Sequence, residues 1–349
     1  MKLSRIKIEK LFGQFDYDIK LNQEEGITIL TGPNGYGKTT ILNIIWSLFT
    51  SGSFLHCSGG TVILSDGNVD RELKFPGNSN EIKNKVPVYL IKDQRIRKTV
   101  MEEKYNSIVH EKVERTKNVI GMLSQELKNY IAEIRAREDE KAKALNASYA
   151  KRLFKYNKVI PKDEFEKRYE GLTEKYQLLQ KYKIYQNDLE KAEYEGENQR
   201  AFSIYLEDWE IKIAIYDELL AKIKLFLSIM DNKGMTNKSF TVNAAQGFCF
   251  TSSDGKPLDL SNLSSGEQHE TILLYEMLFN APPDSLVLID EPETSMHIAW
   301  QIEFLNDIEK IAKLSKLSFI IATHAPDLIN DKMDLCVDLF ENTRRNGND

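Results

Sequence analysis

The chain has 349 residues, of which 41 % are hydrophobic and 29 % are charged, so it can form a sizeable core in two domains or in one domain with a large insertion. Its formal net charge of -6 gives no electrostatic argument for binding nucleic acid, although the total does not exclude a local basic patch. No run of about 18 apolar residues is present and the first residues alternate like a strand, which excludes a membrane-spanning helix and predicts a cytoplasmic protein that needs no membrane.

Residues 1–100 are expected to form an N-terminal lobe of mixed α/β structure. Short alternating or apolar runs bounded by turn residues predict strands, and a longer periodic run predicts a helix. The expected strands are 3–10, 15–21, 26–31, 61–64 and 87–91, and the expected helix is 38–49.

A glycine-rich turn between an apolar strand and a helix fits the pattern GxxxxGK[ST]. Its glycines let the backbone curl with N–H groups pointing inward, and the helix N-terminus adds partial positive charge, so the turn is expected to bind nucleotide phosphates. Lys38 is expected to contact the β- and γ-phosphates, and the Thr39 hydroxyl to ligate Mg²⁺. The expected binding residues are Gly32, Pro33, Asn34, Gly35, Tyr36, Gly37, Lys38, Thr39 and Thr40.

Residues 101–235 differ in character from the lobe before them. Gly and Pro nearly vanish there, and apolar residues follow the 4,3 rhythm of a coiled coil. Seams of about four heptads occupy 109–134 and 202–230, and a looser seam occupies 165–179. This pattern predicts a helical insertion.

The simplest geometry for the insertion is an antiparallel coiled-coil arm that turns near the helix breaker Pro161 and kinks near Gly196. The charged stretch 136–143 interrupts the first seam, so the middle of the arm is expected to be its weakest packed part. A compact bundle folded onto the rest of the protein is the alternative.

The α/β character returns in residues 236–349, the expected C-terminal lobe of the same domain. A turn at 254–255 predicts a hairpin, and helix, strand, helix and strand follow. The apolar run 285–289 ends in Asp290 and Glu291. A buried parallel strand would place both carboxylates in the crevice where α/β sheets bind ligands. We expect Asp290 to hold Mg²⁺ and Glu291 to activate water as general base.

A second anion-binding element is predicted at 263–268, where LSSGEQ precedes an apolar-periodic helix, because small residues at a helix start present hydroxyl and N–H groups. LSSGEQ resembles the signature of ABC ATPases. The order of phosphate loop, signature, acidic strand and Ala322-Thr323-His324 is that of ABC-type ATPase heads.

The resemblance implies an α/β P-loop ATPase head that binds ATP and Mg²⁺ and hydrolyses the ATP. In that family the signature of one head caps the ATP held by the phosphate loop of another, which implies a homodimer of heads or a higher homo-oligomer. Ser264 would contact the γ-phosphate bound by the other head and Gly266 would donate from its backbone, with Ser265 and Glu267 completing the signature.

Further positions match the family's motifs. Gln94, after a strand, matches the glutamine that touches Mg²⁺ and the water. His324 matches the switch histidine that senses the γ-phosphate and steadies the water, so it joins Glu291 and Gln94 as a candidate catalytic residue. The stretch 291–295 matches the loop that crosses the dimer interface.

Two departures from the commonest ABC signature indicate which group of ABC-type heads the sequence resembles. Ser265 and Glu267 stand where Gly and Gln are commoner, as in RecF-, SMC- and OLD-like heads. The helical insertion resembles the arm of SMC-like repair ATPases, but it is shorter and has no Cys pair for a zinc hook. OLD-like proteins carry a nuclease domain after the head, whereas only a short stretch follows His324.

Stand-alone heads of this kind resemble the ATPase components of bacterial anti-phage defence systems, which implies an ATPase that controls a separate nuclease or toxin effector. A RecF- or SMC-like repair or recombination ATPase that clamps DNA is the alternative. A third reading is a scaffold that binds ATP to assemble and hardly turns it over, and the intact Glu291 argues against it.

The remaining histidines and cysteines carry no predicted chemistry. His269 and His297 are expected to be satisfied core or surface residues. Cys57, Cys249 and Cys336 lie far apart without a CxxC pair, which indicates neither disulfides nor a zinc site, and we expect buried free thiols.

Overall fold

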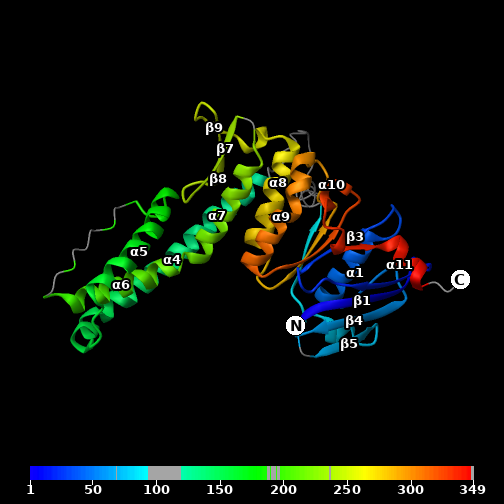
Figure 1. The fold of residues 1–349 in the computed structure, drawn as a ribbon, viewed down its shortest axis with the longest axis horizontal. Coiled ribbons are helices and arrows are strands. Elements are labelled where there is room, and N and C mark those ends of the chain that lie inside the picture. Colours follow the sequence, from blue (N-terminus) through cyan, green and yellow to red (C-terminus); the bar gives the residue numbers. More distant parts are fainter. Residues whose placement is uncertain are drawn as a thin grey trace, which may run out of the picture. The chain divides into compact units, whose positions relative to one another are not determined.

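The computed structural model of the chain describes residues 1–67, 69–92, 119–186, 189, 194, 197–235 and 237–346. Its backbone divides into two compact units, one made of residues 1–119 with 263–349 and the other of residues 120–262. We call them the first unit and the helical unit, and Figure 1 labels their elements along the chain.

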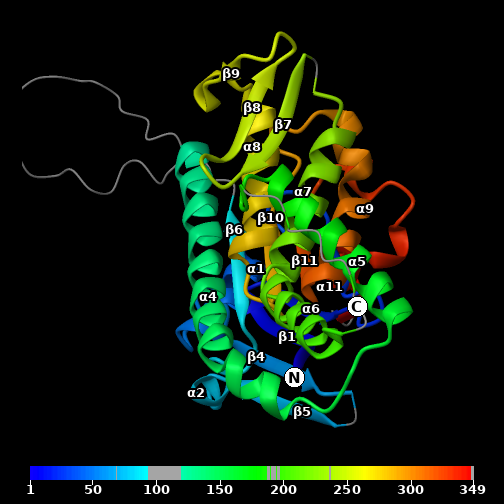
Figure 2. The ribbon, with the colours of Figure 1, turned by 90° about the vertical axis from the view of Figure 1, so that its left-hand side faces the viewer.

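A parallel sheet runs through the first unit in the order β12-β3-β11-β10-β6. Its strands are β3 (Ile27–Thr31), β6 (Val88–Lys92), β10 (Leu286–Asp290), β11 (Ser318–Ala322) and β12 (Cys336–Asp338). In β10 only Asp290 is not fully buried, which is the continuous apolar run expected of a strand covered on both faces. Since all the pairings are parallel, the carboxyl ends of these strands lie at one edge. Figure 2 labels three neighbouring strands of this sheet, β6, β10 and β11.

An antiparallel sheet, ordered β2-β1-β4-β5, covers the same core from another side. Its strands are β1 (Lys2–Leu11), β2 (Phe15–Lys20), β4 (Gly59–Ser65) and β5 (Asp70–Phe75). Strand β5 is not predicted from the sequence, because only Leu73 and Phe75 of its residues are buried and the others are exposed at the edge of the sheet.

Helix α1 (Lys38–Thr50) packs into the core that both sheets share. Ile41, Leu42, Ile45 and Leu48 are at most 1 % exposed, so the helix is held along its length by apolar contacts. The glycine-rich turn that precedes α1 is therefore fixed at both ends, by strand β3 and by a buried helix. The strands expected at 26–31 and 87–91 and the helix expected at 38–49 are confirmed.

The other helices of the first unit follow from the C-terminal part of the chain. They are α8 (Ser265–Tyr275), which continues into a π-helical turn at Glu276–Asn280, α9 (Ile298–Ser315), α10 (Pro326–Ile329) and α11 (Leu339–Asn346), with the short α2 (Ser79–Ile82) before β6. Helix α11 is tied to β2 by Asn342, whose side chain accepts from the N–H of Asp18 at 2.9 Å and donates to its carbonyl at 3.0 Å.

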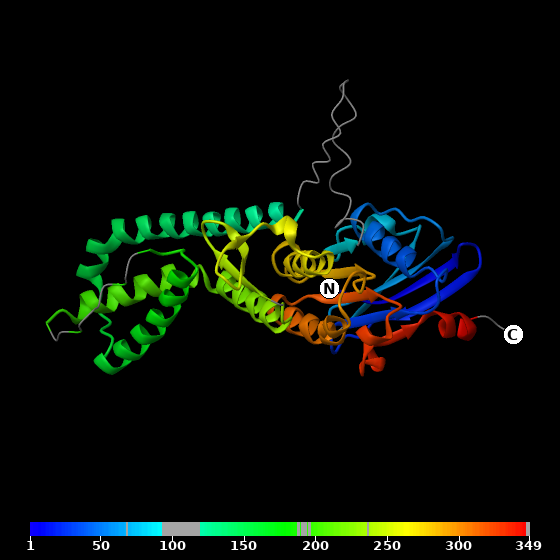
Figure 3. The ribbon, with the colours of Figure 1, turned by 90° about the horizontal axis from the view of Figure 1, so that it is seen from above.

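The helical unit contains α4 (Val119–Lys155), α5 (Lys162–Lys181), α6 (Gln199–Ala214) and α7 (Asp217–Asn232). Figure 3 shows α4 running along the unit, with α5 and α6 near its C-terminal end. Arg152 of α4 donates to both carboxylate oxygens of Asp208 in α6, at 2.6 and 2.7 Å. Arg168 of α5 pairs with Glu210 of α6. The turn expected near Pro161 is confirmed, because Pro161 caps α5. No helix within the described part of the chain is long and apolar enough to cross a membrane.

The structure differs from the expected seams at one point. The seam at 202–230 is broken between α6 and α7, where Tyr216 is fully buried and its ring lies 5.9 Å from that of Tyr185. No Gly or Pro marks this break, so tertiary packing sets it. The charged stretch 136–143 is mostly exposed, with Glu138 its one buried residue at 6 % exposure, so its place as the weakest packed part of the arm stays a prediction. The seam residues at 109–118 and the kink at Gly196 lie outside the described residues.

The boundary expected between 235 and 236 differs from the observed one. A small sheet of β7 (Lys238–Asn243), β8 (Gly247–Ser252) and β9 (Pro257–Leu258) belongs to the helical unit. The reason is an aromatic contact, since the ring of Phe226 in α7 lies 4.7 Å from Phe240 and 5.9 Å from Phe248. The chain returns to the first unit at Leu263. That the helical unit works as an antiparallel arm stays a prediction.

We predict that Gly247→Ala destabilises the helical unit strongly, because a Cβ there would lie 1.8 Å from the carbonyl oxygen of Ser124 in α4. Gly255→Ala is the matched control, since Gly255 has the same left-handed backbone and open space around it. We expect the free energy of unfolding to fall by about 1 kcal/mol for Gly255→Ala and by more than about 3 kcal/mol for Gly247→Ala. Urea unfolding followed by circular dichroism measures both. Equal losses would contradict the steric account.

Candidate functional site

The turn between β3 and α1 has the backbone that its glycines predict. Gly32, Gly35 and Gly37 have φ values of 133°, 90° and 84°, which L side chains rarely adopt. Helix α1 follows directly with Gly37 as its N-cap and no side-chain cap bond. The N–H groups of its first turn are therefore available to an anion.

Lys38 lies inside this loop. It is only 6 % exposed, and its ammonium group donates to the carbonyls of Gly32 at 2.7 Å and Pro33 at 3.3 Å. The loop is held from outside by the Tyr17 hydroxyl, which donates to the carbonyl of Tyr36 at 2.7 Å. Burial raises the pKa of Tyr17, so this hydroxyl keeps its proton.

Thr39 and Asp290 come together although 251 positions separate them in the chain. The Thr39 hydroxyl donates to a carboxylate oxygen of Asp290 at 2.9 Å. This contact forms because β3 and β10 are both neighbours of β11, and their carboxyl ends lie at one edge of the sheet.

The Thr39 hydroxyl and the Asp290 carboxylate are too few to ligate a metal ion without other ligands, but they suit a Mg²⁺ ion that also binds phosphate and water. Within the described ranges, no cluster of three or more His, Cys, Asp or Glu could hold an ion. Mg²⁺ usually binds one or two protein oxygens together with phosphates and water. The pair of one hydroxyl and one carboxylate beside the glycine-rich loop fits this mode of binding.

Glu291 follows β10 in a strained conformation, with φ at 48°, a left-handed value that is rare outside glycine. Its backbone N–H donates to the carbonyl of Ala322 at 2.9 Å, which continues the pairing of β10 with β11. The carboxylate is half-exposed and lies 3.7 Å from Nδ1 of His324. The predicted base and the predicted switch histidine are therefore neighbours.

The signature residues open helix α8 with a capping box. The Ser264 hydroxyl accepts from the N–H of Glu267 at 3.3 Å, and the Glu267 carboxylate accepts from the N–H of Ser264 at 2.7 Å. Ser264 and Ser265 are exposed, as expected of residues that meet a ligand. Glu267 is instead buried, so its side chain caps helix α8 and does not face a nucleotide.

The signature turn packs against the segment that follows Glu291. A Cβ on Gly266 would lie 2.6 Å from the carbonyl oxygen of Ser295. His269, one turn further along α8, is buried with a ring nitrogen 3.1 Å from the carbonyl oxygen of Pro292. The expectation of satisfied histidines is confirmed for both residues. His269 lies in the core, and the exposed His297 caps α9 by accepting from the N–H of Ala299 at 3.2 Å.

Two sets of residues in this region are missed by sequence reasoning. Glu293 is buried and contacts Thr323 and His324, as described below. Phe12 and His56 are exposed, with ring centroids 5.9 Å apart, and a Cβ on Gly37 would lie 3.3 Å from the ring of Phe12. An apolar residue in a turn, as in LFGQ at 11–14, is the one signal that points to Phe12.

Gln94 and the three cysteines are not among the residues that the structure brings together here. Gln94 falls outside the described residues. The three cysteines are free and only half-buried. Burial raises the pKa of Cys336 to about 11.

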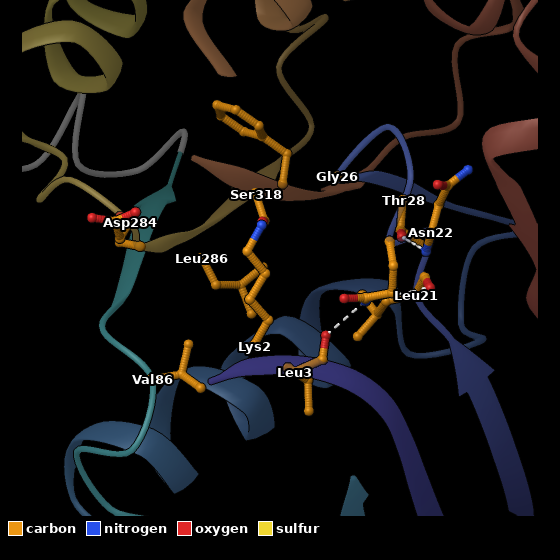
Figure 4. A pocket seen from close by; sticks show the side chains of 13 residues that line it. Lys2, Leu3, Leu21, Asn22, Gly26, Thr28, Val86, Asp284, Leu286 and Ser318 are labelled. Carbon is orange, nitrogen blue, oxygen red and sulfur yellow. Dashed lines mark hydrogen bonds between the residues drawn. The ribbon is translucent and has the colours of Figure 1, made fainter. Parts of the chain in front are cut away.

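A small pocket of the first unit is separate from these residues. It lies between the start of β1 and the amino ends of β3, β10 and β11, where Thr28, Leu286 and Ser318 line it (Figure 4). Two of its polar groups are paired, because the Thr28 hydroxyl accepts from the N–H of Asn22 at 2.9 Å and the Leu3 carbonyl accepts from Gln23 at 3.0 Å. The buried hydroxyl of Ser285, which also lines the pocket, has no hydrogen-bond partner among the described residues. The phosphate loop is at the opposite edge of the sheet.

Several known proteins are similar to this chain. Over 64 residues it is 41 % identical to the Septu protein PtuA of Bacillus thuringiensis, a stretch that makes up 18 % of this chain and 13 % of that protein. The SMC head domain from Thermotoga maritima is 13 % identical with a TM-score of 0.42, over 96 % of this chain and 92 % of that one. The Smc head domain of Pyrococcus furiosus, solved with the C-terminal domain of ScpA, is 13 % identical with a TM-score of 0.39, over 94 % and 91 %.

A family model with the description "AAA domain, putative AbiEii toxin, Type IV TA system" matches residues 27–330. The match begins at strand β3, just before the phosphate loop, and takes in the signature, Asp290 and His324. It confirms the resemblance to the ATPase heads of defence systems. Since the model covers most of the sequence, the chain belongs to this family of AAA domains.

Proposed function

We propose that the protein binds ATP with Mg²⁺ and hydrolyses it. The observation that carries this proposal is the 2.9 Å contact between Thr39 and Asp290, which assembles a metal-binding pair beside the glycine-rich loop. Lys38 and the N–H groups at the start of α1 bind the phosphates. Thr39 and Asp290 hold the Mg²⁺, and the ion neutralises charge on the β- and γ-phosphate oxygens when bound.

Glu291 is the proposed general base. Its carboxylate is half-exposed at the end of a rigid strand, beside the metal-binding Asp290, where an attacking water can reach it. The strained backbone of Glu291 supports this role, because strained residues often gather at functional sites. The exposed Phe12, next to Gly37, offers a face on which the base of the nucleotide can stack.

The proposed working form is a head-to-tail homodimer. Ser264 and Ser265 are exposed at the N-terminus of an eleven-residue helix, so hydroxyl and N–H groups there can bind a second phosphate group. A second copy that supplies its own ATP would bring a γ-phosphate to this position. Glu267 takes no part, because it is buried in the capping box.

The proposed biological role is control of a separate nuclease or toxin effector in a bacterial anti-phage defence system. Two observations support it: the toxin–antitoxin description of the matching family and the similarity to the Septu protein PtuA over 64 residues. The helical unit, with its own core and small sheet, is a candidate surface for the effector.

The hydrolysis proposal predicts two distinct defects. Glu291→Gln is expected to lower kcat for ATP hydrolysis about 100-fold or more while ATP still binds, because only the base is lost. Lys38→Ala is expected to lose ATP binding itself. Phosphate release and titration with a fluorescent ATP analogue measure the two quantities. Glu309→Gln, a charge change in an ion pair of α9, is the control with unchanged turnover. Normal hydrolysis by Glu291→Gln would refute the assignment of the base.

The dimer proposal predicts that ATP traps the Glu291→Gln protein as a dimer and that adding Ser264→Arg abolishes this dimer, because the larger side chain blocks the signature. Each monomer should still bind ATP. Light scattering coupled to size exclusion measures the masses. Ser253→Arg, at an exposed serine in the turn after β8, is the matched control and should dimerise normally. An ATP-dependent dimer of the Ser264→Arg protein would contradict the proposal that the signature lies in the dimer interface.

The effector proposal predicts that the tagged chain copurifies with the product of a neighbouring gene from its native host. Protection of cells against phage should need both genes together with Lys38. A chain that purifies alone and still protects cells without its neighbour would overturn the proposal.

A further inference from the structure

Glu293 is a buried acid in the segment between β10 and α9, and one of its carboxylate oxygens accepts two hydrogen bonds and lies next to the imidazole of His324. Oε1 accepts from the Thr323 hydroxyl at 2.8 Å and from the N–H of His324 at 3.0 Å, and it lies 3.1 Å from Nδ1 of His324. The residue is 8 % exposed. A buried carboxylate is costly without such partners, so its position is set by them.

The support on which Glu293 rests is rigid. The Thr323 hydroxyl accepts from the N–H of Ala325 at 3.0 Å. The backbone N–H of Thr323 donates to the carbonyl of Leu30 in β3 at 3.2 Å. On the other side, the carbonyl of Glu293 accepts from the N–H of Met296 at 2.9 Å. The carboxylate is therefore held between two fixed pieces of backbone.

The imidazole of His324 has two carboxylates within reach of Nδ1, and the nearer is Glu293, at 3.1 Å against 3.7 Å for Glu291. A carboxylate that accepts from Nδ1 fixes the tautomer, because the proton then stays on Nδ1 and Nε2 becomes the acceptor. It also leaves the carboxylate of Glu291 available for water.

We propose that Glu293 is a positioning residue for ATP hydrolysis, which holds the ring of His324 with its proton on Nδ1 and its Nε2 presented to the reacting groups. This inference rests on the proposed function. Glu293 acts through His324 and need not touch the nucleotide. This role would explain why Glu293, an acid only two residues after Glu291, is buried.

The first test is kinetic. Glu293→Gln keeps the shape of the side chain but loses its charge, and we expect kcat to fall roughly 10- to 100-fold with KM for ATP changed less than about twofold. In a His324→Ala background the same change should alter kcat less than about twofold, because the group through which it acts is gone. Glu309→Gln is the matched control for loss of a charge in the same unit.

Two kinetic outcomes would overturn the proposal: an unchanged kcat for Glu293→Gln, or an equal loss with and without His324, which would leave Glu293 a purely structural role. Glu291→Gln is measured in parallel. If the wild-type protein hydrolyses no ATP or Glu291→Gln keeps full activity, the proposed function fails. If Glu291→Gln is inactive and Glu293→Gln is normal, only the present inference fails.

The second test needs no turnover. Nitrogen-15 chemical shifts of the imidazoles, with the His324 signals assigned by their loss in His324→Ala, report the tautomer at pH 8. We expect the Nδ1-protonated form in the wild-type protein and a shift toward the Nε2-protonated form in Glu293→Gln. An Nε2-protonated His324 in the wild-type protein would sink the proposal whatever the ATPase assay shows.

Discussion

The parallel pairing of β3, β11 and β10 is the constraint on which the rest of the site depends. It brings the ends of distant segments to one edge, so that Thr39 meets Asp290 and Glu291 lies near His324. Apolar packing makes the arrangement rigid, because α1 is buried against both sheets and β10 is covered on both faces. A site assembled in this way has little freedom to reorganise, which is the condition for electrostatic stabilisation of a charged transition state.

Three buried charged side chains of the first unit have backbone or hydroxyl partners. Lys38 donates to the carbonyls of its own loop, Glu267 accepts from the N–H of Ser264, and Glu293 accepts from Thr323 and His324. The buried carboxylate of Glu267 lies in the signature turn, and the buried carboxylate of Glu293 follows the acidic strand β10. Each accepts from a backbone N–H, of Ser264 or of His324, and the side chains of these two residues are exposed.

The phosphate loop and the acidic strand could be predicted from the sequence because each is a local pattern, a strand followed by glycines or by acids. The capping box was also readable, since Ser264 and Glu267 have the S-x-x-E spacing, although the family resemblance suggested a ligand contact for Glu267 instead. The role of Glu293 was not readable, because it depends on a contact with residues about thirty positions away that no spacing encodes. The same holds for the break at Tyr216 and for the placement of the β7–β8 hairpin, which aromatic packing decides.

Gly266 leaves no space for even a methyl group between the start of α8 and the carbonyl of Ser295, and His269 adds a second contact to Pro292. These close approaches join the signature turn to the stretch that carries Glu291 and Glu293, so neither can shift without displacing the other. Anything that binds at the start of α8 would therefore also displace the backbone of residues 292–295, which directly follows Glu291.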